Sequence, residues 1–221
     1  MSLLDLLCPP RCASCGEPGA SACRRCRAPL EERARPHRPT PSPAGLPPLW
    51  VVASYDGSVR QLLLGFKERG LAGLADTLAV ALADAVRESL SGREGPVALV
   101  PVPSSAAAVR QRGDDVVALL ARRAARALRR GRTPAQVVPA LGHARLVADS
   151  AGLSATQRAL NLRGAFVVRP WAATVLRPLT VVVVDDLVTT GATLCEASRA
   201  LAAGQVHVTA AAAVAATRRR G

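Results

Sequence analysis

Two adjacent carboxylates, Asp185 and Asp186, follow an apolar run and precede a loop rich in hydroxyl groups. The stretch Val181–Leu194 reads VVVVDDLVTTGATL. If the valines form a strand and a helix starts in the loop, the segment Thr189–Thr193 offers free N–H groups, a helix dipole and threonine hydroxyls to one small volume. Gly191 permits a positive φ and a close approach of the backbone. This combination predicts a site for a dianionic phosphate.

The two carboxylates need a different partner, because they would repel a phosphate. Ionised carboxylates only accept hydrogen bonds, and ribose hydroxyls beside a 5′-phosphate are suitable donors. Mg²⁺ could also lie near them through water. Neither G-x-x-x-x-G-K-[ST] nor a G-x-G-x-x-G after a strand occurs in the chain. The stretch therefore indicates a ribose 5-phosphate site, and the alternative is a helix simply capped by Asp or Thr.

The second group with chemical potential is a cysteine cluster, CPPRCASCGEPGASACRRC, which holds five of the six cysteines. Cys12 and Cys15 form one C-x-x-C pair, and Cys23 and Cys26 form another. Two such turns can place four thiolates around one tetrahedral zinc ion. Cys8 is a spare that could replace Cys12. Four sulfur ligands leave no open position for catalysis, so the predicted zinc is structural; disulfides and redox-active thiols are the alternatives.

The charge balance suggests the kind of partner. The formal net charge is +13, and Lys67 is the only lysine among the basic residues. Such a balance favours a polyanion or a phosphorylated ligand, although a solvated arginine-rich surface explains it equally well. The opening residues do not form a secretory signal, and the apolar segment 208–216 is too short to span a bilayer. We therefore expect a cytoplasmic protein without a membrane span.

These groups must be positioned by a regular scaffold, and the sequence patterns predict an α/β domain. Apolar runs that resemble strands alternate with amphipathic helical patterns, which indicates a doubly wound, mainly parallel sheet. We expect a zinc-binding module at 1–35, a Pro-rich linker at 36–48 and the α/β domain at 49–221. The predicted strands are 49–54, 97–103, 136–138, 181–184 and 206–216. The predicted helices are Pro29–Arg35, 58–70, 74–90, 114–130, 156–164 and 189–203.

The stretch Val181–Leu194 resembles the motif with which type I phosphoribosyltransferases bind 5-phosphoribosyl 1-pyrophosphate (PRPP). Together with the double C-x-x-C, it is similar to the ComF family of competence proteins. Further similarities cover most of the chain and lie in YDGSVRQLLLGFKERG (55–70), VPVP (100–103), RQRG (110–113) and QRALNLRGAF (157–166). The resemblance implies a type I phosphoribosyltransferase-like fold with a small N-terminal zinc module.

The resemblance also assigns roles to residues. Asp185 and Asp186 would contact the ribose hydroxyls of PRPP. The 5′-phosphate would lie on Thr189, Thr190, Gly191, Ala192 and Thr193. Arg110, Arg112 and Lys67 are the candidates for the pyrophosphate, which would bind together with Mg²⁺.

The chain departs from the family at two places. Gly113, Asp114, Asp115 and Val116 replace the family's Gly-Phe-Asn-Gln, and Thr189 stands where purine-salvage enzymes carry an aspartate. Threonine has no useful basic pKa, so no catalytic residue is assigned.

The function implied by the family is DNA uptake in natural transformation, through DNA binding and with PRPP as a ligand. Single-stranded DNA and the DNA-uptake machinery are then the expected partners, and Mg²⁺-dependent phosphoribosyl transfer is the expected chemistry. Two alternatives remain open: a phosphoribosyltransferase of nucleotide metabolism with an unknown acceptor, and a PRPP sensor without catalysis.

Overall fold

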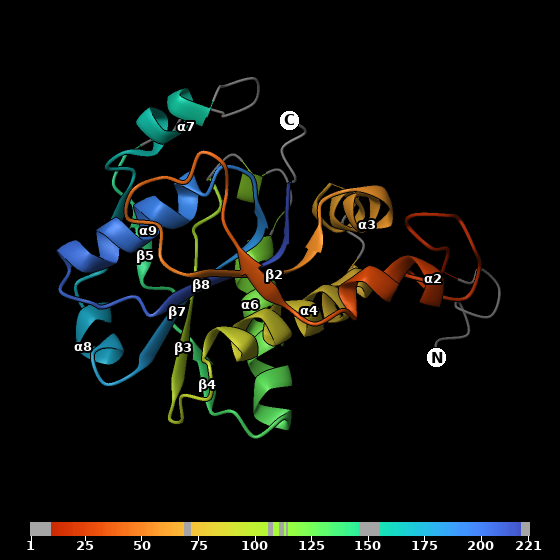
Figure 1. The fold of residues 1–221 in the computed structure, drawn as a ribbon, viewed down its shortest axis with the longest axis horizontal. Helices are drawn as coiled ribbons and strands as arrows, with labels where there is room; N and C mark the ends of the chain where they lie inside the picture. Colours follow the sequence, from red (N-terminus) through yellow and green to blue (C-terminus); the bar gives the residue numbers. More distant parts are fainter. Residues whose placement is uncertain are drawn as a thin grey trace.

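The computed structural model describes residues 10–68, 72–105, 108–110, 113, 115–145 and 155–217 (Figure 1). Its centre is a six-stranded sheet in the order β1-β2-β8-β7-β3-β4. All neighbouring strands are parallel except β1, which pairs antiparallel with the edge of β2. The strands are β1 (Arg35–His37), β2 (Leu49–Ser54), β3 (Val97–Pro101), β4 (Ala135–Val137), β7 (Thr180–Val188) and β8 (Ala210–Ala216). The predicted class, α/β with a mainly parallel sheet, is confirmed.

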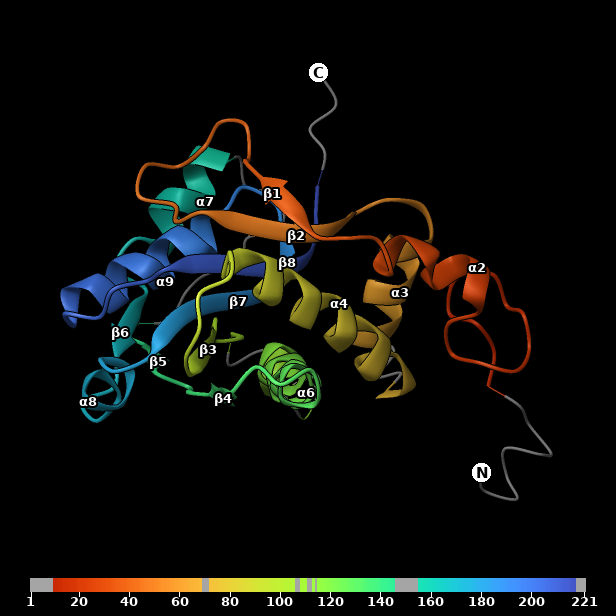
Figure 2. The ribbon, with the colours of Figure 1, turned by 60° about the horizontal axis from the view of Figure 1, so that its bottom comes forward.

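Helices cover both faces of this sheet. The helices α4 (Ala75–Ser89) and α6 (Val116–Arg130) pack against each other and against the strands (Figure 2). Their crossovers run in the same direction along the sheet, whereas α9 (Ala192–Ala203) connects β7 to β8 in the opposite direction. Since βαβ crossovers are right-handed, α9 lies on the other face. Strand β8 consists of alanines and one valine, all buried, and these small side chains let α4 pack closely on the centre of the sheet.

The connections leave β3 and β7 in opposite directions. After β3 the chain passes through α6 to β4, on one side, and after β7 it passes through α9 to β8, on the other. Since β3 and β7 are hydrogen-bonded neighbours, their carboxyl ends form a topological switch point. In open parallel sheets this is the position of the crevice that binds ligands.

Several predicted boundaries shift. Residues Pro29–Arg35 were expected to be helical, which is wrong: α2 (Arg24–Arg27) and the 3₁₀ helix η1 (Ala28–Leu30) precede an extended segment. Strand β7 extends past its valines to Val188, so the acid pair lies inside the strand rather than after it. The remaining predicted helices are present, as α3 (Gly57–Lys67), α4, α6, α7 (Ala155–Leu162) and α9.

The sequence patterns did not reveal a small subdomain between β4 and β7. It holds an antiparallel pair, β5 (Leu141–His143) and β6 (Phe166–Val168), followed by α8 (Ala172–Leu176). Each of these strands has only three residues, too few to show an alternating pattern.

The Pro-rich segment 38–48, called the strap from here on, follows the edge strand β1 and leads into β2. Figure 1 shows it as an orange loop that passes over α9. None of the helices within the described ranges is long and apolar enough to cross a membrane.

Candidate functional site

The acid pair lies at the switch point. Strand β3 ends its pairing with β7 at Pro101, opposite Val184, and Asp185 is the next residue of β7. Neighbouring side chains of a strand point to opposite faces, so the two carboxylates diverge. Asp186 is only 2% exposed and its Oδ2 lies 2.6 Å from Lys67 Nζ at the end of α3, whereas Asp185 is partly exposed.

Asp185 is the acid of the pair that reaches solvent. Its Oδ1 accepts a hydrogen bond of 2.8 Å from the N–H of Asp186. Burial by the surrounding protein raises the pKa of Asp185 to about 7; Lys67 opposes this shift and the nearby charge of Asp115 adds to it. Two carboxylates that repel each other in this way form a local environment that favours a cation.

The hydroxyl loop begins where β7 ends. Thr189 is exposed, Thr190 is partly buried, and Gly191 has a φ of +77° as the N-cap of α9. The alternative of an Asp or Thr at the cap position is not observed, because glycine occupies it; the Thr190 hydroxyl accepts only a long bond of 3.4 Å from Ala192 N–H. The start of α9 thus combines a left-handed glycine with neighbouring hydroxyls, a combination that favours an anion.

The loop after β3 lies on the other side of the switch point. Asp115 caps α6 by accepting hydrogen bonds of 3.1 Å from the N–H groups of Val117 and Ala118. The same carboxylate accepts a bond of 2.8 Å from the Ser104 hydroxyl. In the sequence, Asp115 stood out only as a departure from the Gly-Phe-Asn-Gln pattern of the ComF family. An acid directly before an amphipathic helix is a capping signal that could have placed it.

The three residues predicted to bind the pyrophosphate do not form one cluster among the described residues. Arg110 is exposed in the short segment 108–110, and Lys67 is engaged with Asp186. Arg112 lies outside the described residues. His143 of β5 also reaches this region, since its Nε2 lies 3.0 Å from the Ser104 carbonyl and its ring meets Phe166 edge-on at 5.5 Å.

The strap covers the start of α9. A Cβ atom on Gly191 would lie 3.3 Å from both Leu46 Cδ2 and Pro39 Cγ. The Cys195 thiol, one turn further along α9, donates a hydrogen bond of 3.0 Å to the Ala44 carbonyl. The segment predicted as a linker therefore contacts the loop predicted to bind phosphate.

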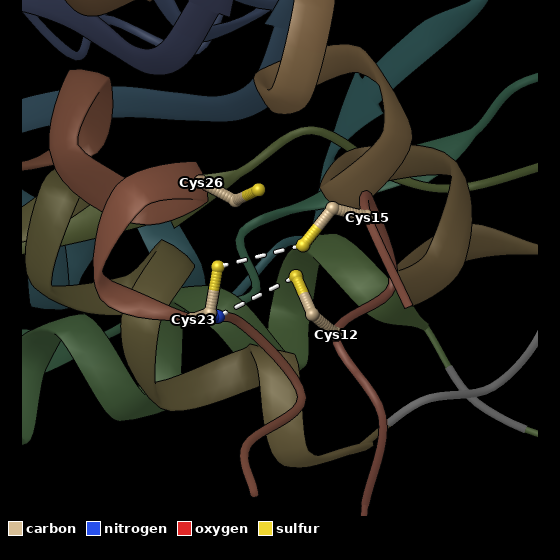
Figure 3. Close-up of side chains that lie close together, drawn as sticks. All are labelled: Cys12, Cys15, Cys23 and Cys26. Atoms are coloured by element: carbon tan, nitrogen blue, oxygen red, sulfur yellow. Dashed lines mark hydrogen bonds between the residues drawn. The ribbon is translucent and has the colours of Figure 1, made fainter. Parts of the chain in front are cut away.

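The cysteine cluster forms a second candidate site (Figure 3). The Sγ atoms of Cys12, Cys15, Cys23 and Cys26 all lie within 4.8 Å of one another. Cys15 Sγ and Cys23 Sγ are 3.6 Å apart. Zinc–sulfur bonds of about 2.3 Å in a tetrahedron put sulfurs about 3.8 Å apart, so the cluster fits such an ion. These four cysteines can hold a metal ion such as zinc; Cys8 lies outside the described residues.

The electrostatics of the cluster also fit a bound cation. Burial raises the pKa of Cys12, but N–H groups of Cys23, Cys15 and Ser14 directed at its sulfur outweigh this and lower the value to about 6. Burial and the other cluster thiols raise the pKa of Cys26 to about 12. Without a metal ion, Cys12 favours the thiolate form and Cys26 the protonated thiol. A bound metal ion would stabilise all four thiolates at once.

Arg25 adds positive charge beside the cluster. The pKa of Arg25 is raised, first by its hydrogen bond to Cys15 and then by the charges of the cluster. Arg27 instead pairs with Glu31 at 3.0 Å.

The chain matches no protein-family model, and no curated protein shows significant similarity to it.

Proposed function

We propose that this protein binds PRPP at the crevice between the carboxyl ends of β3 and β7. The observation that supports the proposal is the position of Asp185 and the Thr189–Thr193 loop at the switch point of the sheet. Parallel sheets bind phosphorylated ligands there, and a partly exposed acid next to a glycine-hydroxyl loop matches a ribose beside its 5′-phosphate.

In this proposal different residues contact different parts of PRPP. Ionised Asp185 accepts a hydrogen bond from a ribose hydroxyl, and the start of α9 donates to the 5′-phosphate. Asp186 contributes more indirectly, because it is buried against Lys67. Mg²⁺ would neutralise the diphosphate, and the mutually repelling Asp185 and Asp115 are the acids that would attract it.

We expect Asp185→Asn to weaken PRPP binding by roughly tenfold or more, because a hydrogen bond to a charged group contributes about 1.5–3 kcal/mol. Titration calorimetry with Mg²⁺ measures this. The control Glu94→Gln removes an equal charge from an exposed loop and should bind PRPP like the wild type. Equal affinities for the wild type and Asp185→Asn would refute the ribose assignment.

The same variant should not lose stability, which separates a binding defect from unfolding. The folded pKa of Asp185, about 7, exceeds its ordinary value of 3.8. The stability that this carboxyl contributes is therefore full below pH 4 and disappears as the pH rises through 7. At pH 8 we expect Asp185→Asn to be more stable than the wild type by on the order of 1–2 kcal/mol, a value reduced for its partial exposure. Below about pH 4, where this carboxyl is mainly protonated in both the folded and the unfolded chain, thermal melts of the two should coincide.

A measurement of PRPP turnover distinguishes a phosphoribosyltransferase from a PRPP sensor without catalysis. A transferase would break the bond between C1′ of the ribose and the pyrophosphate oxygen, form a bond from C1′ to a nucleophile and release pyrophosphate. Pyrophosphate release from PRPP and Mg²⁺, assayed with nucleobases and with single-stranded DNA, identifies an enzyme and its acceptor class. PRPP binding without release would favour a sensor.

We further propose that the ion in the cysteine cluster is zinc with a structural role. Support comes from the all-sulfur ligand set, which suits Zn²⁺ and leaves no position for a substrate.

DNA binding is a second candidate function, supported by a row of arginines on α6. Arg122, Arg126 and Arg130 are exposed and follow each other at intervals of one helical turn. Arg123 and Arg129 are already engaged, with Asp76 and the Ala135 carbonyl. Within the part of the chain that the structure describes, these three guanidinium groups have no hydrogen-bond or ion-pair partner, and such a row on one helix face is suited to a nucleic-acid backbone.

We expect the affinity for single-stranded DNA to fall steeply with salt. Replacing Arg122, Arg126 and Arg130 together by glutamine should reduce the slope of log K against log salt by about 2, since each phosphate contact contributes about 0.7. Fluorescence anisotropy at several ionic strengths measures both slopes. The control is the triple replacement of Arg60, Arg93 and Arg169, which are exposed elsewhere and carry the same charge. Identical slopes for the two triple variants would argue against an interface on α6.

A further inference from the structure

A cavity of about 700 Å³ lies between the strap and α9; it shares Ala192 with the predicted phosphate loop, but neither Asp185 nor a residue of β3 is among the described residues that line it. Residues of α7 and of the segment before β8 complete its walls. Figure 1 shows how the strap passes over α9 at this place. Its volume lies within the range of roughly 300–1,000 Å³ that small-molecule sites have. We call it the strap groove.

The walls of the groove are mainly apolar. Prolines and small residues of the strap form one side, and Ala192, Cys195 and Ala202 of α9 lie opposite. Leu160 of α7 borders the groove and is 64% exposed, a large apolar side chain in contact with water. An apolar body that covers these surfaces would release water from them.

Glu196 is the one acid among the described residues that line the groove, and it is not available to a ligand. Glu196 is 5% exposed, and its two carboxylate oxygens accept bonds of 2.7 Å from Nε and a terminal nitrogen of Arg199. Glu196 also accepts a bond of 3.3 Å from Phe166 N–H. The pair carries no net charge, so Glu196 offers no free negative charge to a cation.

The border of the groove is basic. Arg163 and His207 line it and are exposed, and among the described residues the Arg163 guanidinium has no hydrogen-bond or ion-pair partner. We infer that the strap groove binds a small amphiphilic anion, with an apolar body against the strap and α9 and an acidic group toward Arg163. Charge complementarity selects an anion, and the volume and apolar walls select a compact aromatic or aliphatic body.

The anionic dye 1-anilinonaphthalene-8-sulfonate, used with the full-length protein, tests this inference. We expect saturable binding at one site, seen as a fluorescence increase that inorganic phosphate does not displace. Ala202→Trp fills the groove and should weaken binding by roughly tenfold or more. Ala203→Trp places the same side chain on the next residue of α9, which is exposed but does not line the groove, and should leave binding unchanged.

The charge of the ligand is tested separately with the neutral analogue N-phenyl-1-naphthylamine. Arg163→Gln should weaken binding of the anionic dye by about threefold or more and leave the neutral analogue unaffected, as loss of one exposed charge contact predicts. Arg169→Gln, an exposed arginine outside the groove, is the control. Cys195 gives an independent readout, because its thiol lines the groove and bound dye should slow its alkylation by N-ethylmaleimide, mapped by mass spectrometry.

Three results would overturn the inference. The first is equal dye affinity in the two tryptophan variants, which would place the dye elsewhere. The second is an equal effect of Arg163→Gln on the anionic and the neutral dye, which would remove the charge argument. The third is an unchanged alkylation rate of Cys195 at saturating dye.

Discussion

Replacing Gly191 with alanine is expected to lower the free energy of unfolding by about 1–3 kcal/mol and to abolish measurable PRPP binding. The residue has a φ of +77°, a conformation that side chains rarely adopt. The new Cβ would also lie 3.3 Å from Leu46 and Pro39, so the strap would have to move. Chemical denaturation measures the loss of stability, and calorimetry measures the loss of affinity.

A matched glycine separates backbone strain from contact with the strap. Gly92 has the same φ of +77°, but a Cβ there would meet nothing within 4 Å. Gly92→Ala should therefore lose stability through strain alone and keep PRPP affinity. In Gly191→Ala we also expect faster alkylation of Cys195, because a displaced strap no longer accepts the hydrogen bond of this thiol at Ala44. Full PRPP affinity in Gly191→Ala would show that the loop does not bind the phosphate.

Replacing Cys23 with serine is expected to release the metal ion and unfold the cysteine module. Structural zinc sites contribute binding free energies of about 10 kcal/mol or more, and that free energy is largely folding free energy. The module packs tightly on the domain, since a Cβ on Gly73 would lie 2.5 Å from Ser21 Oγ. Elemental analysis should show a fall from one equivalent of zinc to none, and the midpoint of thermal unfolding should fall by several degrees.

Two single variants control this experiment. Cys195→Ser removes a thiol that is not part of the cluster and should retain one equivalent of metal. Cys8→Ser tests the spare cysteine, and full metal content in this variant shows that Cys12 completes the site. One equivalent of zinc in purified Cys23→Ser would disprove the four-cysteine proposal.

The elements that surround the candidate site were largely predictable, because each has a strong local signal. The valines of β7, the periodicity of α4 and α6, and the glycine before α9 are patterns that the chain itself displays. The two C-x-x-C pairs likewise predicted the four sulfurs that the structure brings together.

The relations between these elements were not predictable from such patterns. Asp185 and Asp186 have the same chemistry in the sequence, yet only Asp186 is buried against Lys67. Their difference arises from the alternation of a strand that continues beyond its apolar run, and from the position of α3. Ser104 and Asp115 meet because a loop returns to the end of β3, a tertiary contact without periodicity.

The position of the strap is likewise a tertiary feature that the sequence pattern did not predict. Its prolines predicted an extended linker. The structure describes no regular helix or strand in it, and a turn forms where the Leu46 N–H donates to the Pro43 carbonyl. Nothing in that composition indicates that Leu46 and Pro39 pack on Gly191.

The strap also determines an order of events during biosynthesis. Cys12 and Cys23, whose sulfur and amide meet in the cluster, are 11 residues apart, so this module can take up its metal soon after it leaves the ribosome. Ala44 and Cys195 are 151 residues apart, so the strap has nothing to dock on until nearly the whole chain has been translated. Contacts of such separation form late. The nascent chain therefore carries an undocked proline-rich segment through most of its synthesis, and closure of the strap over α9 is among the last steps of maturation.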